Sequence, residues 1–361
     1  MKTLILSLWS ALLLITQVNA QQQPELSVDS PRSTSTSHNS NVSVNTRINV
    51  QEEAEDPLKV KKFTKTFGLD KNDKVSLTNQ YGSITIKTWD KNEIKVDADI
   101  KAYANTDADA QKLLDNVSII ATKTGDLASF KTVIENSNKN GWNWGSGNNN
   151  GKKWRKEVKI HLIVYMPPSN SLTASQSYGN INLSDFSGPT LLKVQYGNLI
   201  AGDLNNSNNY IAVDYGKTVA KNIDQAKIRL QYGGGLTIAS IGNLDLNAEY
   251  TNINIAELKG NASGAIQYGK LNISEISTGC KSISVKADYS NINLGFNGNY
   301  NAEFNVATNY GGFKYSSAIK ARKEGDGDKG WSSSKKYTGQ IGKGGSAKIN
   351  IDAEYGSVSF K

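Results

Sequence analysis

Residues 174–183 read ASQSYGNINL, and residues 192–201 read LKVQYGNLIA, so the same Tyr-Gly-Asn segment returns after 18 residues. Tyrosine followed by Gly, Ser or Thr recurs at Tyr81, Tyr178, Tyr196, Tyr215, Tyr232, Tyr250, Tyr268, Tyr289, Tyr310 and Tyr355. Between Tyr178 and Tyr268 the steps are 18, 19, 17, 18 and 18 residues, and two steps of 21 follow. A fixed period near 20 residues is typical of stacked repeat units.

Alignment of the repeats on the tyrosine places apolar residues in common columns. Four positions before it stand Leu77, Ala174, Leu192, Ile211, Ile228, Leu246, Val285, Val306 and Ile351, with Gly264 as the exception. Inward positions lie at even offsets before the tyrosine and at odd offsets after it, so the period-2 alternation of a strand slips by one. The chain therefore bends at Tyr-Gly-Asn, and we expect the glycine to supply the positive φ of the corner.

The column immediately before the tyrosine is polar and faces outward. It reads Gln195, Asp214, Gln231, Glu249, Gln267, Asp288 and Asn309, an alternation of amide and acid. Alternation keeps carboxylates from lying next to each other and lets amides donate hydrogen bonds to them. The sequence thus predicts a hydrogen-bonded ladder of side chains.

These patterns predict an all-β fold, namely a single-stranded right-handed parallel β-helix (a β-solenoid) over residues 58–361. Two insertions, at 136–153 and 321–336, interrupt the period. One short amphipathic helix is expected in the N-terminal part, from Asp107 to Val117, because apolar side chains recur there at helical spacing. We expect this helix to cover an open edge or face of the solenoid.

The N-terminal segment indicates export. Lys2 precedes an apolar run from Leu4 to Ile15 and a small-residue site ending at Ala20, which is the pattern of a signal peptide over residues 1–20. The apolar run is too short to span a membrane, and no later segment qualifies. Residues 21–57 are rich in Ser, Thr and Asn and offer little to bury, so we expect a disordered tether. The mature protein is expected in the periplasm, outside the cell or on its surface.

The distribution of charge argues against a nucleic-acid partner, and the cysteine count excludes an intrachain disulfide. The formal net charge is +8, but the basic residues are spread along the chain and form no nucleic-acid-binding block. Cys280 is the only cysteine, so no intrachain disulfide can form, and we expect it to be a small buried residue.

Catalytic constellations are sparse. His38 lies in the tether and His161 in an apolar strand, which argues against histidine-based triads and metal sites. The acids of the outward column lie two repeats apart, about 10 Å, beyond the roughly 6.5–9.5 Å of inverting glycosidases. Asp326 and Asp328 are too few ligands for calcium. We expect no catalytic residue, no metal and no cofactor.

Four tryptophans are the candidate binding residues. Trp142, Trp144, Trp154 and Trp331 lie in or beside the two Gly-rich insertions, where an indole could stack on a sugar. The alternative is that they fold back and cover the flank of the solenoid. The repeated tyrosines carry the same two interpretations, a carbohydrate-binding face or simple packing, and their parity with the inward columns favours packing.

The chain resembles the bacterial family labelled putative adhesin, a domain of unknown function with a β-helix fold. The resemblance rests on NQYGSITI (79–86), WDKNEIKV (89–96), VYMP (164–167) and SYGNI (177–181), and it extends over about residues 60–361. Such motifs are structural, so the resemblance implies architecture and brings no catalytic or binding residues with it.

Function is therefore expected to be that of an exported, non-catalytic binding or scaffold module of the cell envelope. Its partner would be an envelope glycan or protein, and not a nucleic acid. Two alternatives stay open, a polysaccharide-cleaving β-helix enzyme and a purely structural spacer, and the oligomeric state is left open as well.

Overall fold

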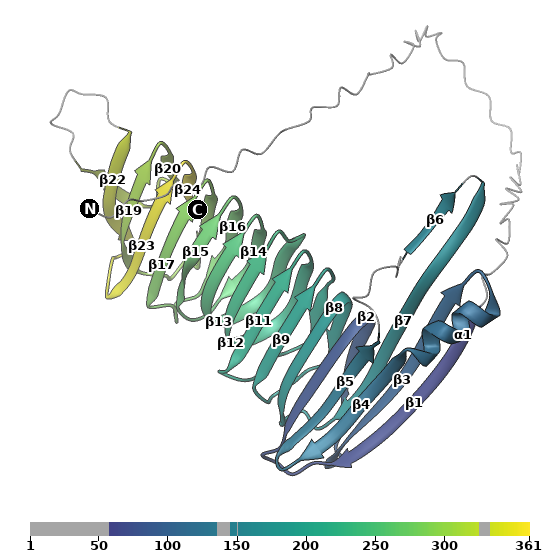
Figure 1. Ribbon diagram of the computed structural model, residues 1–361. Coiled ribbons are helices and arrows are strands. Elements are labelled where there is room, and N and C mark those ends of the chain that lie inside the picture. Colours follow the sequence, from purple (N-terminus) through teal and green to yellow (C-terminus); the bar gives the residue numbers. More distant parts are fainter. Residues whose placement is uncertain (1–57, 136–144, 150, 325–332) are drawn as a thin grey trace, which may run out of the picture. The chain divides into compact units, whose positions relative to one another are not determined.

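The computed structural model describes residues 58–135, 145–149, 151–324 and 333–361. The proposed signal peptide and tether, together with His38, Trp142, Trp144, Asp326, Asp328 and Trp331, lie outside these residues. The described chain is all-β with one helix, as expected, and its strands join in one extended sheet (Figure 1).

The first part of the chain forms a mixed sheet (Figure 1). Its elements are β1 (Leu58–Gly68), β2 (Lys74–Thr88), β3 (Glu93–Ala104), α1 (Asp107–Asp115), β4 (Val117–Thr124), β5 (Leu127–Ile134), β6 (Gly145–Asn149) and β7 (Lys152–Met166). β3 pairs antiparallel with both β1 and β7, and antiparallel pairs also join β4 to β5 and β6 to β7. β2 lies parallel to β5, β7 and β8, so it connects this region to the repeats.

The repeat region consists of parallel strands. They are β8 (Ser171–Leu183), β9 (Thr190–Gln195), β10 (Leu199–Ala201), β11 (Asn209–Asp214), β12 (Lys217–Gln231), β13 (Gly235–Glu249), β14 (Asn252–Leu258), β15 (Ala262–Gln267), β16 (Lys270–Ile276), β17 (Ser282–Asp288) and β18 (Asn291–Phe296). Equivalent residues of successive repeats are register partners, as Ile211 is with Leu192 and with Ile228. The tyrosine alignment therefore gave the correct register here.

The prediction of a single-stranded right-handed parallel β-helix over residues 58–361 is wrong. β8, β9, β11, β12 and β10 pair in a closed ring, which makes a five-stranded parallel barrel with many further strands outside it. The first half of β8 pairs with β9 and its second half with β10. In the same way, the first half of β12 pairs with β10 and its second half with β11. The antiparallel pairs, such as those of β3 with β1 and β7, also differ from the all-parallel pairing that was predicted. Side-chain alternation reports which residues face inward, but it does not report which strand occupies each edge.

The C-terminal strands are not arranged in chain order. They are β19 (Ala302–Asn309), β20 (Gly312–Tyr315), β21 (Lys320–Lys323), β22 (Ser334–Ile341), β23 (Ala347–Glu354) and β24 (Ser357–Phe360). β23 pairs with β17 on one side and β19 on the other, and β24 lies between β18 and β20. β22 pairs antiparallel with the outer edge of β19. The insertion predicted at 321–336 thus begins and ends in strands that cover an otherwise open edge.

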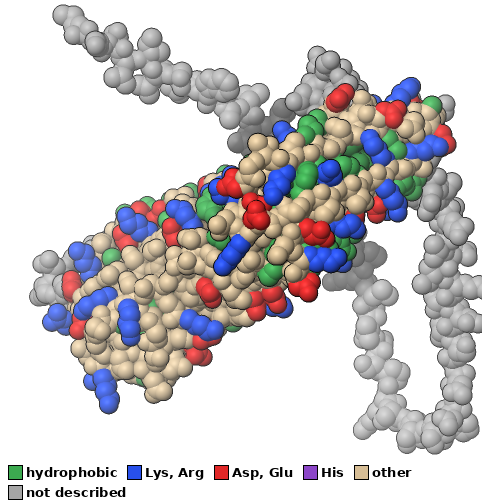
Figure 2. Space-filling view, turned by 90° about the horizontal axis from the view of Figure 1, so that it is seen from below, with side chains coloured by type: hydrophobic (Ala, Val, Ile, Leu, Met, Phe, Trp, Pro, Cys, Tyr) green, Lys and Arg blue, Asp and Glu red, His purple; other side chains and the backbone are tan. Residues whose placement is uncertain are grey.

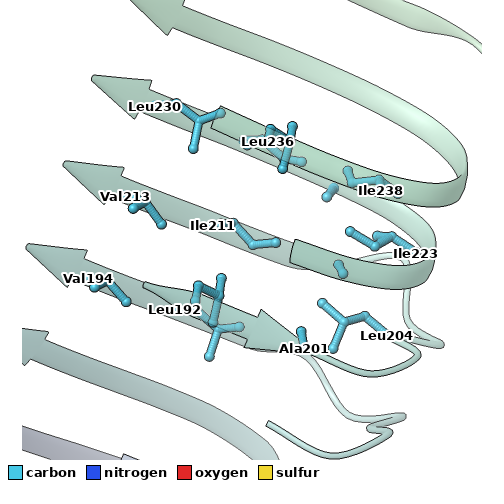
Figure 3. Packing of buried hydrophobic residues seen from close by; sticks show 14 of the residues in the cluster. Leu192, Val194, Ala201, Leu204, Ile211, Val213, Ile223, Leu230, Leu236 and Ile238 are labelled. Carbon is cyan, nitrogen blue, oxygen red and sulfur yellow. The ribbon is translucent and has the colours of Figure 1, made fainter. Parts of the chain in front are cut away.

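The core is continuous between the repeats. Leu192, Ile211, Ile228 and Leu246 are buried and succeed one another in register, as the alignment predicted. Figure 3 shows Leu192, Ile211 and their labelled neighbours on the inner side of the strands. Cys280 is also buried, as expected, and its burial raises the pKa of the thiol.

Helix α1 confirms the predicted helix. Thr106 is its N-cap, and the Thr106 side-chain oxygen accepts a hydrogen bond from the Asp109 backbone N–H. Ala110, Leu113 and Leu114 are buried, and the helix packs mainly against β3 and β1. It thus packs mainly on the antiparallel strands, whereas the sequence predicted that it would cover an edge or face of a solenoid.

Candidate functional site: an exposed tyrosine ladder

All ten repeat tyrosines share one unusual backbone conformation. Their φ angles lie between 48° and 56°, in the left-handed region that bulky residues rarely adopt. Such a conformation costs free energy and persists only where the surrounding structure enforces it. The bend predicted at Tyr-Gly-Asn is present, but the tyrosine, and not chiefly the glycine, supplies the positive φ.

The glycine after the tyrosine is required for a different reason. A Cβ atom on Gly216 would lie 1.6 Å from the carbonyl oxygen of Gly197, and one on Gly197 would lie 1.9 Å from that of Gly179. Real Cβ atoms do not approach backbone oxygen so closely. The backbones of successive repeats therefore come very close at these two corners, where glycine leaves room for the approach. Thr251 and Ser290 occupy the equivalent position after Tyr250 and Tyr289, so the requirement belongs to particular repeats.

The tyrosine side chains form a continuous stack, which we call the tyrosine ladder. Nine neighbouring pairs have ring centroids 4.6–5.3 Å apart and interplanar angles of 2–12°. The spatial order is Tyr81, Tyr178, Tyr196, Tyr215, Tyr232, Tyr250, Tyr268, Tyr289, Tyr355 and Tyr310. Tyr355 precedes Tyr310 because β23 lies between β17 and β19.

The ladder lies on the surface. The nine tyrosines other than Tyr81 are 44–55% exposed. Because neighbouring rings cover each other's faces, the accessible parts of the interior rings are their edges and hydroxyl groups. The rings pack on one another, as the packing interpretation predicts, and they also present a long aromatic strip to solvent. The carbohydrate-binding interpretation stays a prediction. Contiguous exposed apolar surface of this kind is a feature of interaction sites.

The polar column beside the ladder contains the predicted amide-to-acid hydrogen bonds. The Gln231 side-chain amide donates to Glu249 at 3.3 Å, and that of Gln267 donates to Asp288 at 3.4 Å. Arg229 adds a contact that the column alone did not predict, donating to both Asp214 and Gln231. The strands thus carry matched donors and acceptors along the edge of the ladder.

The predicted alternation fails at one position. The sequence placed Asn309 after Asp288, but the insertion of β23 makes Glu354 the register partner of both. Two acids, Asp288 and Glu354, therefore lie on adjacent strands. Like charges directly across a strand pair destabilise it.

Replacing Gln231 and Gln267 by Glu should lower the melting temperature. Each change puts carboxylates on consecutive strands and costs roughly 0.2–1 kcal/mol, an effect that salt should reduce. Gln267→Glu should cost more, because Arg229 partly neutralises a new charge at position 231. Glu354→Gln is the converse variant and should raise the melting temperature. Thermal melts at low and high salt measure all three, and identical melts would contradict the stacked column.

Among the predicted tryptophans, only Trp154 can be placed. It is half-buried on β7, where Gly147 of β6 lies close against its indole ring. It lines a pocket of about 530 Å³ together with Asp109, Lys112 and Leu113 of α1. No ladder tyrosine lines this pocket, so the structure does not bring Trp154 to the ladder.

A separate pocket of about 580 Å³ lies where the ladder begins. Tyr81, Tyr178, Glu157, Lys159 and His161 are among its lining residues. Its volume is in the range of small-molecule sites. The pocket joins the aromatic strip to the polar outer face of β7.

His161 lies on strand β7, as the sequence predicted, and polar residues of the neighbouring strands lie beside it. Its Nδ1 lies 2.9 Å from Ser83 Oγ, and Asp99 is its register partner on β3. Sequence spacing could not reveal this row, because its members come from three strands. A serine nucleophile activated by histidine would also need free backbone N–H groups to stabilise the oxyanion of its reaction. At Ser83, β2 pairs with β7 on one side and β8 on the other, so the backbone N–H groups there donate to the neighbouring strands.

The stability of the fold should fall as the pH drops below about 6.5, in part because of His161. Burial and the nearby Lys101 and Lys159 lower the pKa of His161 below its usual value, so the folded state disfavours the protonated ring. The unfolded state then binds more protons through this window, and stability is lost as the pH falls. Melting temperatures between about pH 7.5 and 5 should change less in His161→Gln than in the wild type. Equal slopes would contradict the assignment.

The rest of the described chain shows few other features of a reactive site. Across the described ranges, no group of three or more His, Cys, Asp or Glu side chains could hold a metal ion. No helix in the part that the structure describes is long and apolar enough to cross a membrane. Lys, Arg, Asp and Glu side chains are interspersed over the face shown in Figure 2.

The fold and its surface define an all-β protein of parallel repeat strands with an exposed aromatic ladder. No family model matches the chain, so the resemblance to the adhesin family gains no support there. No curated protein matches it either.

Solved structures give distant similarities. A putative lipid binding protein from Parabacteroides distasonis is 12% identical, with a TM-score of 0.40, over 83% of this chain and 96% of that one. A putative adhesin from Bacteroides fragilis is 10% identical, with a TM-score of 0.32, over 83% and 97%. A putative cell adhesion protein from Clostridium sporogenes is 11% identical, with a TM-score of 0.21, over 84% and 99%. With TM-scores this low, these similarities carry no argument about function.

Proposed function

We propose that this protein is an exported, non-catalytic binding or scaffold module of the cell envelope, with the tyrosine ladder as its binding surface. The observation that carries the proposal is the row of nine tyrosines, each 44–55% exposed. Leaving so much aromatic surface in water is unfavourable unless a partner covers it. Export is supported by the signal-peptide pattern that ends at Ala20.

The geometry of the ladder favours a linear envelope glycan as the partner. Ligand rings cannot insert between stacked tyrosines 4.6–5.3 Å apart, so contacts must go to ring edges and hydroxyl groups. These groups repeat at a spacing comparable to the length of one pyranose residue. Tyrosine combines an apolar body with a polar tip, and the adjacent amides and carboxylates supply further hydrogen bonds to sugar hydroxyls.

The test is a binding titration against a panel of envelope polysaccharides. Replacement of Tyr196, Tyr215 and Tyr232 by Phe keeps the rings stacked but removes three hydroxyls, and should weaken binding at least tenfold. The control replaces two tyrosines that lie off the ladder, Tyr103 and Tyr165, by Phe, and it should bind like the wild type. Equal affinity of the ladder variant would contradict the assignment of the surface.

Two further measurements separate the alternatives. A pull-down from envelope extract that recovers a protein and no glycan would replace the glycan by a protein partner. Absence of binding in both experiments would favour a structural spacer. Release of new reducing ends from any bound polysaccharide would contradict a non-catalytic role.

A further inference from the structure

We propose that the tyrosine ladder is also a site of oxidative modification, at which phenols on adjacent strands are joined covalently as dityrosine. This inference concerns the chemistry of the side chains themselves. It does not depend on a glycan or any other partner, so it stands or falls separately from the proposed function.

The spacing of the rings is the first support. Neighbouring phenols lie with their centroids 4.6–5.3 Å apart and nearly parallel. Rotation of both rings about their long axes, without any change in the backbone, turns their edges toward each other and brings together two ring carbons next to the hydroxyl-bearing carbons. A reacting partner held this close has a far higher effective concentration than one on another molecule. Coupling within one chain should therefore outrun coupling between chains in dilute protein.

Accessibility is the second support. The nine tyrosines from Tyr178 to Tyr310 in the ladder are about half exposed, so an oxidant in solution can reach their edges. The ring contacts of other described tyrosines are with different aromatic residues: Tyr165 stacks with Trp89, Tyr300 with Phe296, and Tyr315 and Tyr337 meet Phe313. Among the described residues, the stacked tyrosine–tyrosine pairs therefore belong to the ladder.

The chemistry requires a peroxidase-type oxidant with hydrogen peroxide. Each of two neighbouring phenols loses one electron and one proton, and the two phenoxyl radicals form a carbon–carbon bond between ring positions ortho to oxygen. The hydrogens on the joined carbons then move to the phenol oxygens, which restores both rings. One hydrogen peroxide accepts the two electrons and two protons and becomes two water molecules.

The bond pattern would follow spatial order and not chain order. Tyr355 lies between Tyr289 and Tyr310, so the expected links are Tyr289–Tyr355 and Tyr355–Tyr310, whereas a Tyr289–Tyr310 link is not expected. The first of these joins residues 66 positions apart in the sequence. A bond across so long a loop restricts the unfolded chain and should raise the melting temperature.

The experiment treats dilute full-length protein with a haem peroxidase and hydrogen peroxide. Dityrosine fluorescence should appear in monomeric protein on a denaturing gel, and mass spectrometry of the digest should find links only between spatial neighbours. A melting temperature measured before and after treatment should rise. Links confined to dimers, or the Tyr289–Tyr310 link in place of Tyr289–Tyr355, would overturn the proposal.

Two matched variants test the requirement for adjacency. The alternating variant changes Tyr178, Tyr215, Tyr250, Tyr289 and Tyr310 to Phe, which leaves no two ladder tyrosines side by side. The block variant changes Tyr81, Tyr178, Tyr196, Tyr215 and Tyr232 to Phe and keeps the other five consecutive.

Both variants keep ten stacked aromatic rings and carry the same number of substitutions. The block variant should retain intrachain dityrosine, whereas the alternating variant should lose it. Equal yields in the two variants would overturn the proposal. The link pattern of the wild-type protein tests it independently if either variant folds poorly.

Discussion

Gly216→Ala should lower the free energy of unfolding by about 3 kcal/mol or more. The new Cβ would lie 1.6 Å from the carbonyl oxygen of Gly197 and 3.1 Å from a methyl carbon of Val213. The nearest obstacle is backbone, which cannot rotate away as a side chain can. Because Gly216 has no left-handed φ, the loss would come from contact between repeats and not from the intrinsic conformational preference of glycine.

A matched control lies in the next repeat. A Cβ on Gly234 would meet only the Cβ of Lys217 at 3.6 Å, an ordinary van der Waals distance. Gly234→Ala should therefore change stability by less than about 0.5 kcal/mol. Equilibrium unfolding in urea measures both variants. Similar effects of the two alanines would show that the close backbone approach does not control stability.

Phe360→Ala should be comparably severe and should lower the free energy of unfolding by about 3–5 kcal/mol. Phe360 is 1% exposed. Its ring meets those of Phe296, Phe304 and Phe313 edge to face, at centroid distances of 4.8–5.4 Å and angles of 78–84°. Removal of the ring would leave a cavity among three aromatic side chains that cannot readily close it.

This aromatic cluster also anchors the out-of-order strands. β24 carries Phe360 between β18 and β20, so the ring helps to hold the C-terminal strands in place. Lys361→Ala, at the exposed neighbouring position, is the control and should leave stability nearly unchanged. Thermal and urea unfolding are the measurements. A loss below about 1 kcal/mol for Phe360→Ala would mean that the last strand contributes little to the core.

The candidate site was predictable in part. The tyrosines and the amide–acid column are visible in the repeat, and their stacking follows from register. The exposure of the tyrosines was not predictable, because their position in the period-2 alternation matches the inward columns and therefore favoured buried packing. Of the four candidate tryptophans the structure places only Trp154, which lines another pocket, and their binding role stays a prediction. The contact between Ser83 and His161 joins residues 78 positions apart, and no local pattern signals it.

The amino-acid sequence by itself determined which residues are buried, where the chain bends and which repeat segments match. Alternation and period are local properties, and Leu192, Ile211 and Ile228 occupy the row they predict. Only the tertiary structure decided which strands pair, including the closed five-stranded barrel, the antiparallel strands around β3 and the placement of β23 between β17 and β19. The physical reason is that a strand has two similar hydrogen-bonding edges. The partner that fills each edge is selected by packing across the whole fold.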